Sequence, residues 1–101
     1  MSNLHKPLTG VISGERQGSA TAVQLPTVSG SLIYITALAS NAGNVYLGAA
    51  GVTVPNGTTD TTSGLELTPG AMVGPLPLDN LNRLYMICNN AGDDITYLVL
   101  A

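Results

Sequence analysis

Short apolar segments, each followed by turn residues, repeat along this chain and constrain its fold more than any other feature of the sequence. From residue 20 onward the segments are about four to nine residues long, recur about every eight to twelve residues, and are rich in β-branched side chains. They lie at residues 21–25, 31–39, 44–47, 52–54, 65–67, 71–73, 74–78, 83–88 and 95–100. This spacing is typical of a β-sandwich or a β-barrel.

No stretch of the sequence has a pattern that favours a long helix. Residues 71–84 come closest to a helical pattern, but they contain Pro75 and Pro77, which would break a helix. Residues 79–82 could form a single helical or 3₁₀ turn before the next strand. We therefore expect an all-β fold, a single antiparallel β-sandwich or barrel-like domain of about seven or eight short strands.

The first nineteen residues differ in character from the rest. They combine Pro7 with three glycines, Gly10, Gly14 and Gly18, and they hold most of the positive charge of the chain. Because such a segment has little to bury, we expect residues 1–19 to be a flexible or extended N-terminal arm and residues 20–101 to form the β-sandwich domain.

The last two segments carry apolar residues on both of their alternating faces. Residues 83–88 place Leu84, Met86 and Cys88 on one face, and residues 95–100 place Ile95, Tyr97 and Val99 on one face. Their opposite faces are also largely apolar, although an antiparallel sheet usually leaves one side in water. We therefore expect another subunit to be part of what covers the second faces. The candidate self-association residues are Tyr85, Ile87, Leu98 and Leu100.

Low charge excludes several classes of function. Only 9% of the 101 residues are charged, against about 25% in an ordinary domain. Three Lys and Arg residues stand against six Asp and Glu residues, so the chain lacks the basic surface that binds nucleic acid. The N-terminus has no signal-peptide pattern, and no apolar run approaches the length of a membrane span. We expect a protein made in the cytoplasm, without a nucleic-acid or membrane partner.

Catalytic and cofactor chemistry also lack suitable residues. The single histidine, His5, lies in the expected arm, and the carboxylates Glu15 and Glu66 are expected to face solvent rather than each other. Cys88 lies within an apolar run and is expected to be a buried thiol. The chain has no Cys/His cluster for zinc and no phosphate-binding loop. We expect a protein that is not an enzyme and that uses no cofactor and no metal.

Two polar loops each allow a second interpretation. Oxygen-bearing side chains at Asn89, Asn90, Asp93 and Asp94 could ligate Ca²⁺, but a hairpin turn with solvated carboxylates is the favoured reading. The Thr-rich loop at residues 53–63 could bind a carbohydrate or a protein receptor, or it could be a soluble connection.

A resemblance to a known class of proteins enters at the C-terminal half. The stretches that carry it are Asn-Val-Tyr-Leu-Gly at 44–48, Gly-Val-Thr at 51–53, Gly-Leu-Glu-Leu-Thr-Pro-Gly at 64–70, Asp-Asn-Leu-Asn-Arg-Leu-Tyr-Met-Ile at 79–87 and Gly-Asp-Asp-Ile-Thr-Tyr-Leu at 92–98. In their order and turn chemistry they resemble small β-sandwich structural proteins of tailed bacteriophage virions, among which capsid decoration (cement) proteins occur.

The resemblance implies a non-enzymatic virion protein that binds the major capsid protein on the capsid surface. It would bridge neighbouring subunits and stabilise the shell, as a homo-oligomer with a trimer favoured. The alternatives are another head, tail or fibre-base component, or a carbohydrate- or receptor-binding module that uses loop 53–63. In the arm, the residues expected to contact the partner are Lys6, Leu8, Val11, Ile12 and Arg16.

Overall fold

The computed structural model describes residues 7–101 and is all-β. Its elements are β1 (Val11–Gln17), β2 (Val23–Gln24), β3 (Leu32–Ala37), β4 (Val45–Gly48), β5 (Leu65–Leu67), β6 (Met72–Leu76), the 3₁₀ helix η1 (Leu81–Arg83), β7 (Tyr85–Cys88) and β8 (Asp94–Leu100). The expectation of seven or eight short strands is confirmed.

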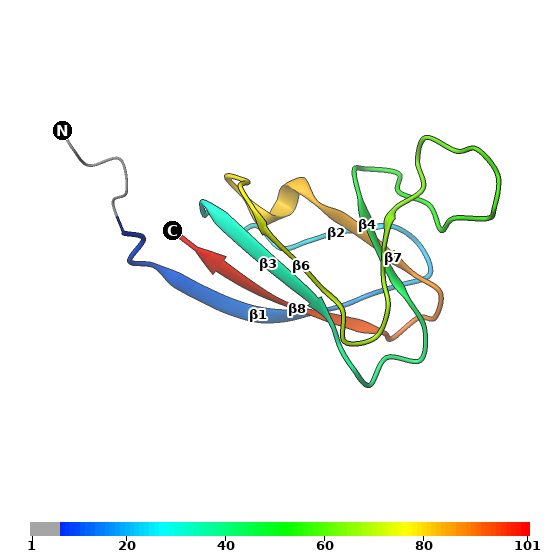
Figure 1. Ribbon diagram of the computed structural model, residues 1–101, viewed down its shortest axis with the longest axis horizontal. Coiled ribbons are helices and arrows are strands. Elements are labelled where there is room, and N and C mark those ends of the chain that lie inside the picture. Colours follow the sequence, from blue (N-terminus) through cyan, green and yellow to red (C-terminus); the bar gives the residue numbers. More distant parts are fainter. Residues whose placement is uncertain (1–6) are drawn as a thin grey trace.

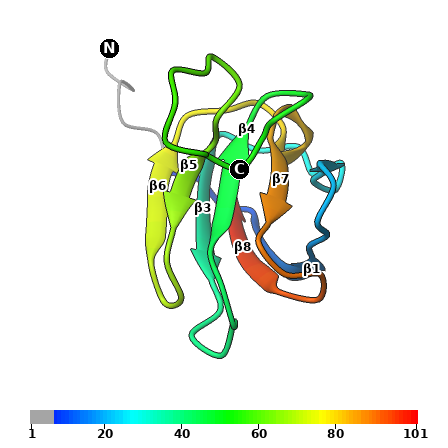
Figure 2. The same ribbon diagram turned by 90° about the vertical axis from the view of Figure 1, so that its right-hand side faces the viewer.

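The strands form two four-stranded antiparallel sheets that pack face to face. Sheet A has the order β1-β8-β3-β6 and sheet B has the order β2-β7-β4-β5. Figures 1 and 2 show β1, β8 and β3 side by side in one layer, with β4 and β7 in the other. The fold is therefore a β-sandwich, as the spacing of the apolar segments predicts.

The core between the sheets consists largely of every second residue along the strands. In β3 the buried residues are Ile33, Ile35 and Ala37, and every second residue turns away. Strands β7 and β8 follow the same rule. The core contains neither Phe nor Trp, because the chain has none. Its buried members are Leu25, Ile33, Ile35, Ala37, Val45, Leu47, Leu67, Leu81, Met86, Cys88, Ile95 and Val99.

Proline and asparagine set the connection between β6 and β7. Pro75 lies within β6, and residues 71–84 contain no α-helix. A short 3₁₀ turn, η1, follows instead, as expected. The side chain of Asn80 caps it by accepting hydrogen bonds from the backbone N–H groups of Asn82 and Val28, both at 3.0 Å.

The expected N-terminal arm is in large part a strand. β1 pairs with β8 along its whole length, from Val11 opposite Leu100 to Gln17 opposite Asp94. Gly14 leaves room for the Tyr97 side chain on the paired strand, because a Cβ at this position would lie against the ring and hydroxyl of Tyr97. Of the glycines that led us to expect a flexible or extended arm, Gly14 thus gives an aromatic ring room to pack. Residues 11–17 form an edge strand of sheet A.

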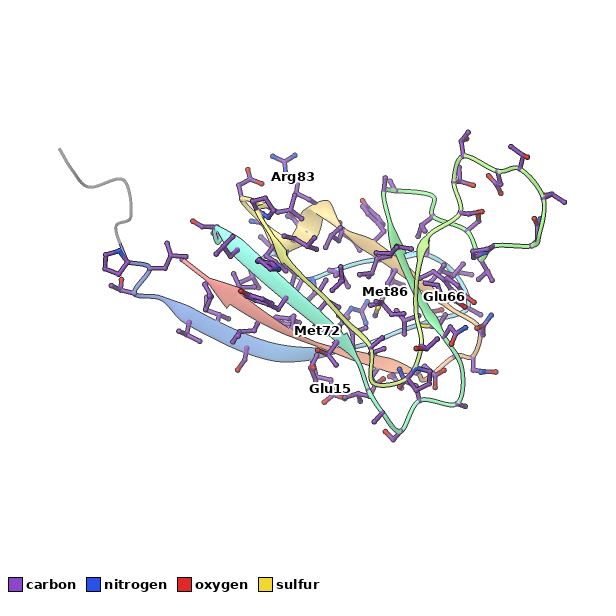
Figure 3. All side chains as sticks on the ribbon, viewed as in Figure 1. Glu15, Glu66, Met72, Arg83 and Met86 are labelled. Carbon is purple, nitrogen blue, oxygen red and sulfur yellow. The ribbon has the colours of Figure 1, made fainter. Side chains whose placement is uncertain are left out.

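Truncating Met86 tests the core directly, because this side chain is fully buried between the sheets (Figure 3). We expect Met86→Ala to lower the free energy of unfolding by about 2–5 kcal/mol, since it removes apolar contacts and leaves a cavity. The volume-conserving variant Met86→Leu should cost less than about 1.5 kcal/mol. Urea unfolding measures both, and equal losses in the two variants would argue against a tightly packed site.

Candidate interaction surface

The outer face of sheet A is the side of the sheet that points away from the core, and it carries side chains from all four strands. Directly paired residues lie on the same face, so the register defines its rows. Three rows cross it: Val11, Leu100 and Leu32; Ser13, Leu98 and Tyr34; and Glu15, Thr96, Thr36 and Met72. Two of the three rows are mainly apolar.

Several large apolar side chains on this face are exposed. The exposed fractions are 67% for Val11, 59% for Met72 and 37% for Leu98. Between the larger side chains lies a hollow of about 660 Å³, and its lining includes Tyr34 and Leu98. Hydroxyl side chains from β1, β3 and β8 also line it, and their small size leaves room beside the larger ones. An apolar, hollowed face of this kind is typical of a site that contacts another molecule.

One end of the face is acidic. Glu15 on β1 and Asp94 on β8 are diagonal neighbours, because Asp94 lies opposite Gln17. Asp94 raises the pKa of Glu15 above its usual range, first because it can share a hydrogen bond with the protonated Glu15 carboxyl, then through its charge, and burial adds a smaller effect. The Oδ1 atom of Asp94 is buried and makes no hydrogen bond within residues 7–101. The two carboxyl groups therefore repel each other when both are ionised.

The residues expected to bind a partner from the arm do not form one surface. Leu8 is exposed ahead of β1, and Val11 lies on the outer face of sheet A. Ile12 and Arg16 lie on the opposite face, because they pair with the core residues Val99 and Ile95. Lys6 lies outside the described residues, as does His5.

The four expected self-association residues are also divided between two surfaces. Leu98 and Leu100 lie on the outer face of sheet A. Tyr85 and Ile87 alternate with the core residues of β7, so they lie on the outer face of sheet B, the opposite side of the sandwich. A single interface formed by one face can therefore include only one of these pairs.

The outer face of sheet B is more polar than that of sheet A. Tyr46, which lies between Ile87 and Glu66, is largely buried there, and its hydroxyl donates to Oδ1 of Asn89 at 3.2 Å. Nδ2 of Asn44 donates to Glu66 Oε2 at 2.6 Å. These bonds satisfy the polar groups locally, which leaves the outer face of sheet A as the better candidate for binding.

Cys88 is buried between the sheets, as expected. Burial raises the pKa of its thiol, and the nearby Asp93 carboxylate raises it further. Its Sγ lies 3.8 Å from the carbonyl oxygen of Asp93. A thiol held in its neutral form is a poor nucleophile and metal ligand, so this residue belongs to the core.

The Asp93 carboxylate, in the loop before β8, holds a neighbouring loop in place through hydrogen bonds. Asp93 is buried, and its two carboxylate oxygens accept the backbone N–H groups of Ala42 and Gly43 at 3.0 and 2.9 Å. Asn89 accepts a hydrogen bond from the Asn44 N–H, and Asn90 belongs to the turn. Within residues 7–101 no group of three or more His, Cys, Asp or Glu side chains could hold a metal ion. These bonds support the turn interpretation over the Ca²⁺ interpretation.

The Thr-rich loop at residues 53–63 is exposed and bonded to itself. The hydroxyls of Thr53 and Thr62 lie 2.9 Å apart, and the Thr62 backbone N–H and hydroxyl both donate to Asp60, at 2.8 and 2.7 Å. Figure 1 shows this loop at the opposite end of the molecule from the start of β1. Its hydrogen bonds satisfy several of its polar groups within the loop.

Sequence reasoning missed two residues of the outer face of sheet A, Tyr34 and Met72. Figure 3 labels Met72. Alternation of Leu32, Tyr34 and Thr36 with the core residues of β3 was the available signal. Met72 gave no such signal, since β6 is short and interrupted by Pro75.

Comparison of the chain with protein-family models, curated proteins and solved structures finds no match. In the part of the chain that the structure describes, no helix is long and apolar enough to cross a bilayer.

Replacing Glu15 with Gln tests the carboxyl pair. In wild-type protein the repulsion from Asp94 is absent below the ordinary Glu pKa of about 4.3 and grows as the pH rises through the higher folded pKa. We therefore expect Glu15→Gln to raise Tm at pH 7 and to leave it unchanged below about pH 4. Thermal unfolding at both pH values measures this, and a Tm gain that is equal at the two would contradict it.

Asp60→Asn is the control of opposite sign. Hydrogen bonds from the backbone N–H and the hydroxyl of Thr62 lower the pKa of Asp60. This carboxylate therefore stabilises the fold above its unfolded pKa and loses that contribution as the pH falls. We expect Asp60→Asn to lower Tm at pH 7 and to have a smaller effect in acid.

Removing the Asp93 carboxylate should destabilise the fold more than Asp60→Asn does, because it leaves two backbone N–H groups without their acceptor. We expect Asp93→Ala to lower the free energy of unfolding by about 2–5 kcal/mol, as breaking buried bonds to a charged group does. Asp93→Asn keeps one acceptor oxygen and should lose less. Urea unfolding compares them, and a loss below about 1 kcal/mol in Asp93→Ala would contradict this role.

Proposed function

We propose that the protein is a non-enzymatic structural protein that attaches to the protein subunits of a larger particle through the outer face of sheet A. The observation that supports this proposal most is the exposed apolar surface around Val11, Leu98 and Met72, with its hollow. In the form suggested by the sequence resemblance, the particle is a tailed-phage capsid, and the protein bridges neighbouring major capsid subunits on its surface.

The charge distribution of this face is suited to burial against another protein. Glu15 is the one charged residue among those that line the hollow, and the other side chains there are apolar or carry neutral hydroxyls. Burying unpaired charge is costly, whereas each Å² of apolar surface removed from water contributes about 25 cal/mol. The acidic pair at one end of the face would favour a basic group on the partner at that position.

Repeated binding allows each individual contact to be modest. A shell displays many identical sites, and a homo-oligomer that engages several of them gains affinity through effective concentration. We expect a homo-oligomer for this reason, and the trimer remains a prediction. Attachment across a shell opposes separation of its subunits, which is how such a protein would stabilise the particle.

The test uses capsids from the phage that carries the gene, prepared with that gene deleted. We expect purified protein to bind stoichiometrically across the shell and to raise the melting temperature of the capsid. The double variant Leu98→Gln/Met72→Gln should weaken binding by at least about tenfold, or about 1.4 kcal/mol, because it makes the outer face of sheet A polar.

Leu65→Gln is the matched control. Leu65 is 57% exposed but lies on β5 of sheet B, so this change should leave binding unchanged. Binding confined to a single vertex or to the tail would favour a head, tail or fibre-base component instead. Equal binding by the double variant and the wild type would reject the outer face of sheet A as the attachment surface.

A further inference from the structure

The outer edge of β1 is the longest regular sheet edge among residues 7–101. Sheet B ends in β2 with two residues and β5 with three. The other end of sheet A, β6, contains Pro75, which has no N–H to donate, and its register with β3 is irregular. Short strands and prolines are features that protect edges from pairing with another chain. β1 has seven residues, no proline, and no strand on its outer side within the described residues.

Hydrogen bonds at both ends of β1 show which of its backbone groups face outward. Gly10 exchanges two bonds with Ala101, at 2.7 and 2.9 Å, and Gly18 donates to the Asp93 carbonyl at 2.7 Å. Because antiparallel bonds alternate along a strand, the even-numbered residues of β1 face β8. The N–H and C=O groups of Val11, Ser13, Glu15 and Gln17 therefore point away from the sheet.

We propose that the outer edge of β1 pairs antiparallel with the same edge of a second copy, about a two-fold axis at Gly14. In this register Ser13 lies opposite Glu15 of the second copy, and Val11 lies opposite Gln17 of the second copy. All four outward-facing residues of each chain then form hydrogen-bonded pairs, which supplies about eight backbone hydrogen bonds. The two sheets A become one continuous eight-stranded sheet.

The register centred on Gly14 is more favourable than the registers centred on Ser13 or on Glu15. Only registers that bring odd-numbered residues opposite odd-numbered residues connect the outward-facing groups. Centring the pair on Ser13 leaves Gln17 without an opposite residue in β1, and centring it on Glu15 places two carboxylates directly opposite each other, which is unfavourable. With the axis at Gly14, each Glu15 carboxylate instead lies opposite a Ser13 hydroxyl that can donate to it.

The composition of β1 and its neighbours fits a shared edge. Gly14 has no side chain at the axis, and the Tyr97 ring packs against it, so the two Tyr97 rings would approach each other across the axis. The outer faces of the two sheets A become contiguous, since directly paired residues share a face. A two-fold pair is a dimer, so this proposal differs from the trimer that the sequence suggested. It does not rest on attachment to a particle.

Sedimentation of purified protein at rising concentration tests the proposal. We expect a transition from 10.3 kDa to twice that mass below about 1 mM, and a monomer throughout this range would overturn the proposal. Ser13→Pro should remain monomeric, because it removes an outward-facing N–H and blocks the pairing while sparing the bonds to β8. Ser13→Ala, which keeps the backbone groups, should still dimerise. Dimerisation by both variants would also overturn the proposal.

A pair of cysteines tests the register and does not depend on how Ser13→Pro folds. The double variant Ser13→Cys/Glu15→Cys places two pairs of thiols opposite each other, one on each side of the axis, at a separation that a disulfide can span. Mild oxidation should link most of the protein into covalent dimers. Ser13→Cys alone should remain unlinked, since the two copies of residue 13 are not opposite. Linking by the single variant, or none by the double variant, would overturn the register.

Discussion

The position of β8 between β1 and β3 is the constraint on which the rest of this structure depends. Its odd-numbered residues bond to β1 and point into the core, where Ile95 and Val99 are buried. Its even-numbered residues bond to β3 and point outward. One register therefore decides which side chains of three strands stabilise the fold and which remain on the surface, and a shift of one residue would exchange the two sets.

That division explains how a chain with few charges presents large apolar side chains on one outer face as well as in its core. In β3 and β8 the odd-numbered apolar residues lie in the core. The even-numbered residues point outward, which places Leu98 beside Tyr34 on the outer face of sheet A. The thiol and the buried carboxylate, Cys88 and Asp93, are both used in packing or in hydrogen bonds to backbone. The outer face of sheet A and the outer edge of β1, the two surfaces proposed to bind other molecules, adjoin each other.

Sequence alone predicted much of the fold, because period-two alternation and turn residues act locally. The strands around Met86 and Val99 and the turn at Asn80 could be located in this way. It failed where the outcome depends on distant parts of the chain. The sequence placed Gly14 in a flexible or extended arm, because the residue that accounts for this glycine, Tyr97, lies 83 positions later in the chain. Alternation assigned Ile87 to an outward face, as it did Leu98, but could not show that the two strands belong to different sheets.

Amide hydrogen exchange along β1, followed residue by residue by NMR, tests the account most directly. In the Ser13→Pro monomer, the amides of Ile12, Gly14 and Arg16 should exchange slowly, and those of Val11, Glu15 and Gln17 should exchange rapidly. In concentrated wild-type protein the second group should become protected as well. Protection of all six amides in the monomer would contradict the assignment of the even-numbered residues of β1 to the bonds with β8 and of the odd-numbered residues to the outer edge. Rapid exchange of the odd-numbered amides in concentrated wild-type protein would contradict the pairing of two β1 edges.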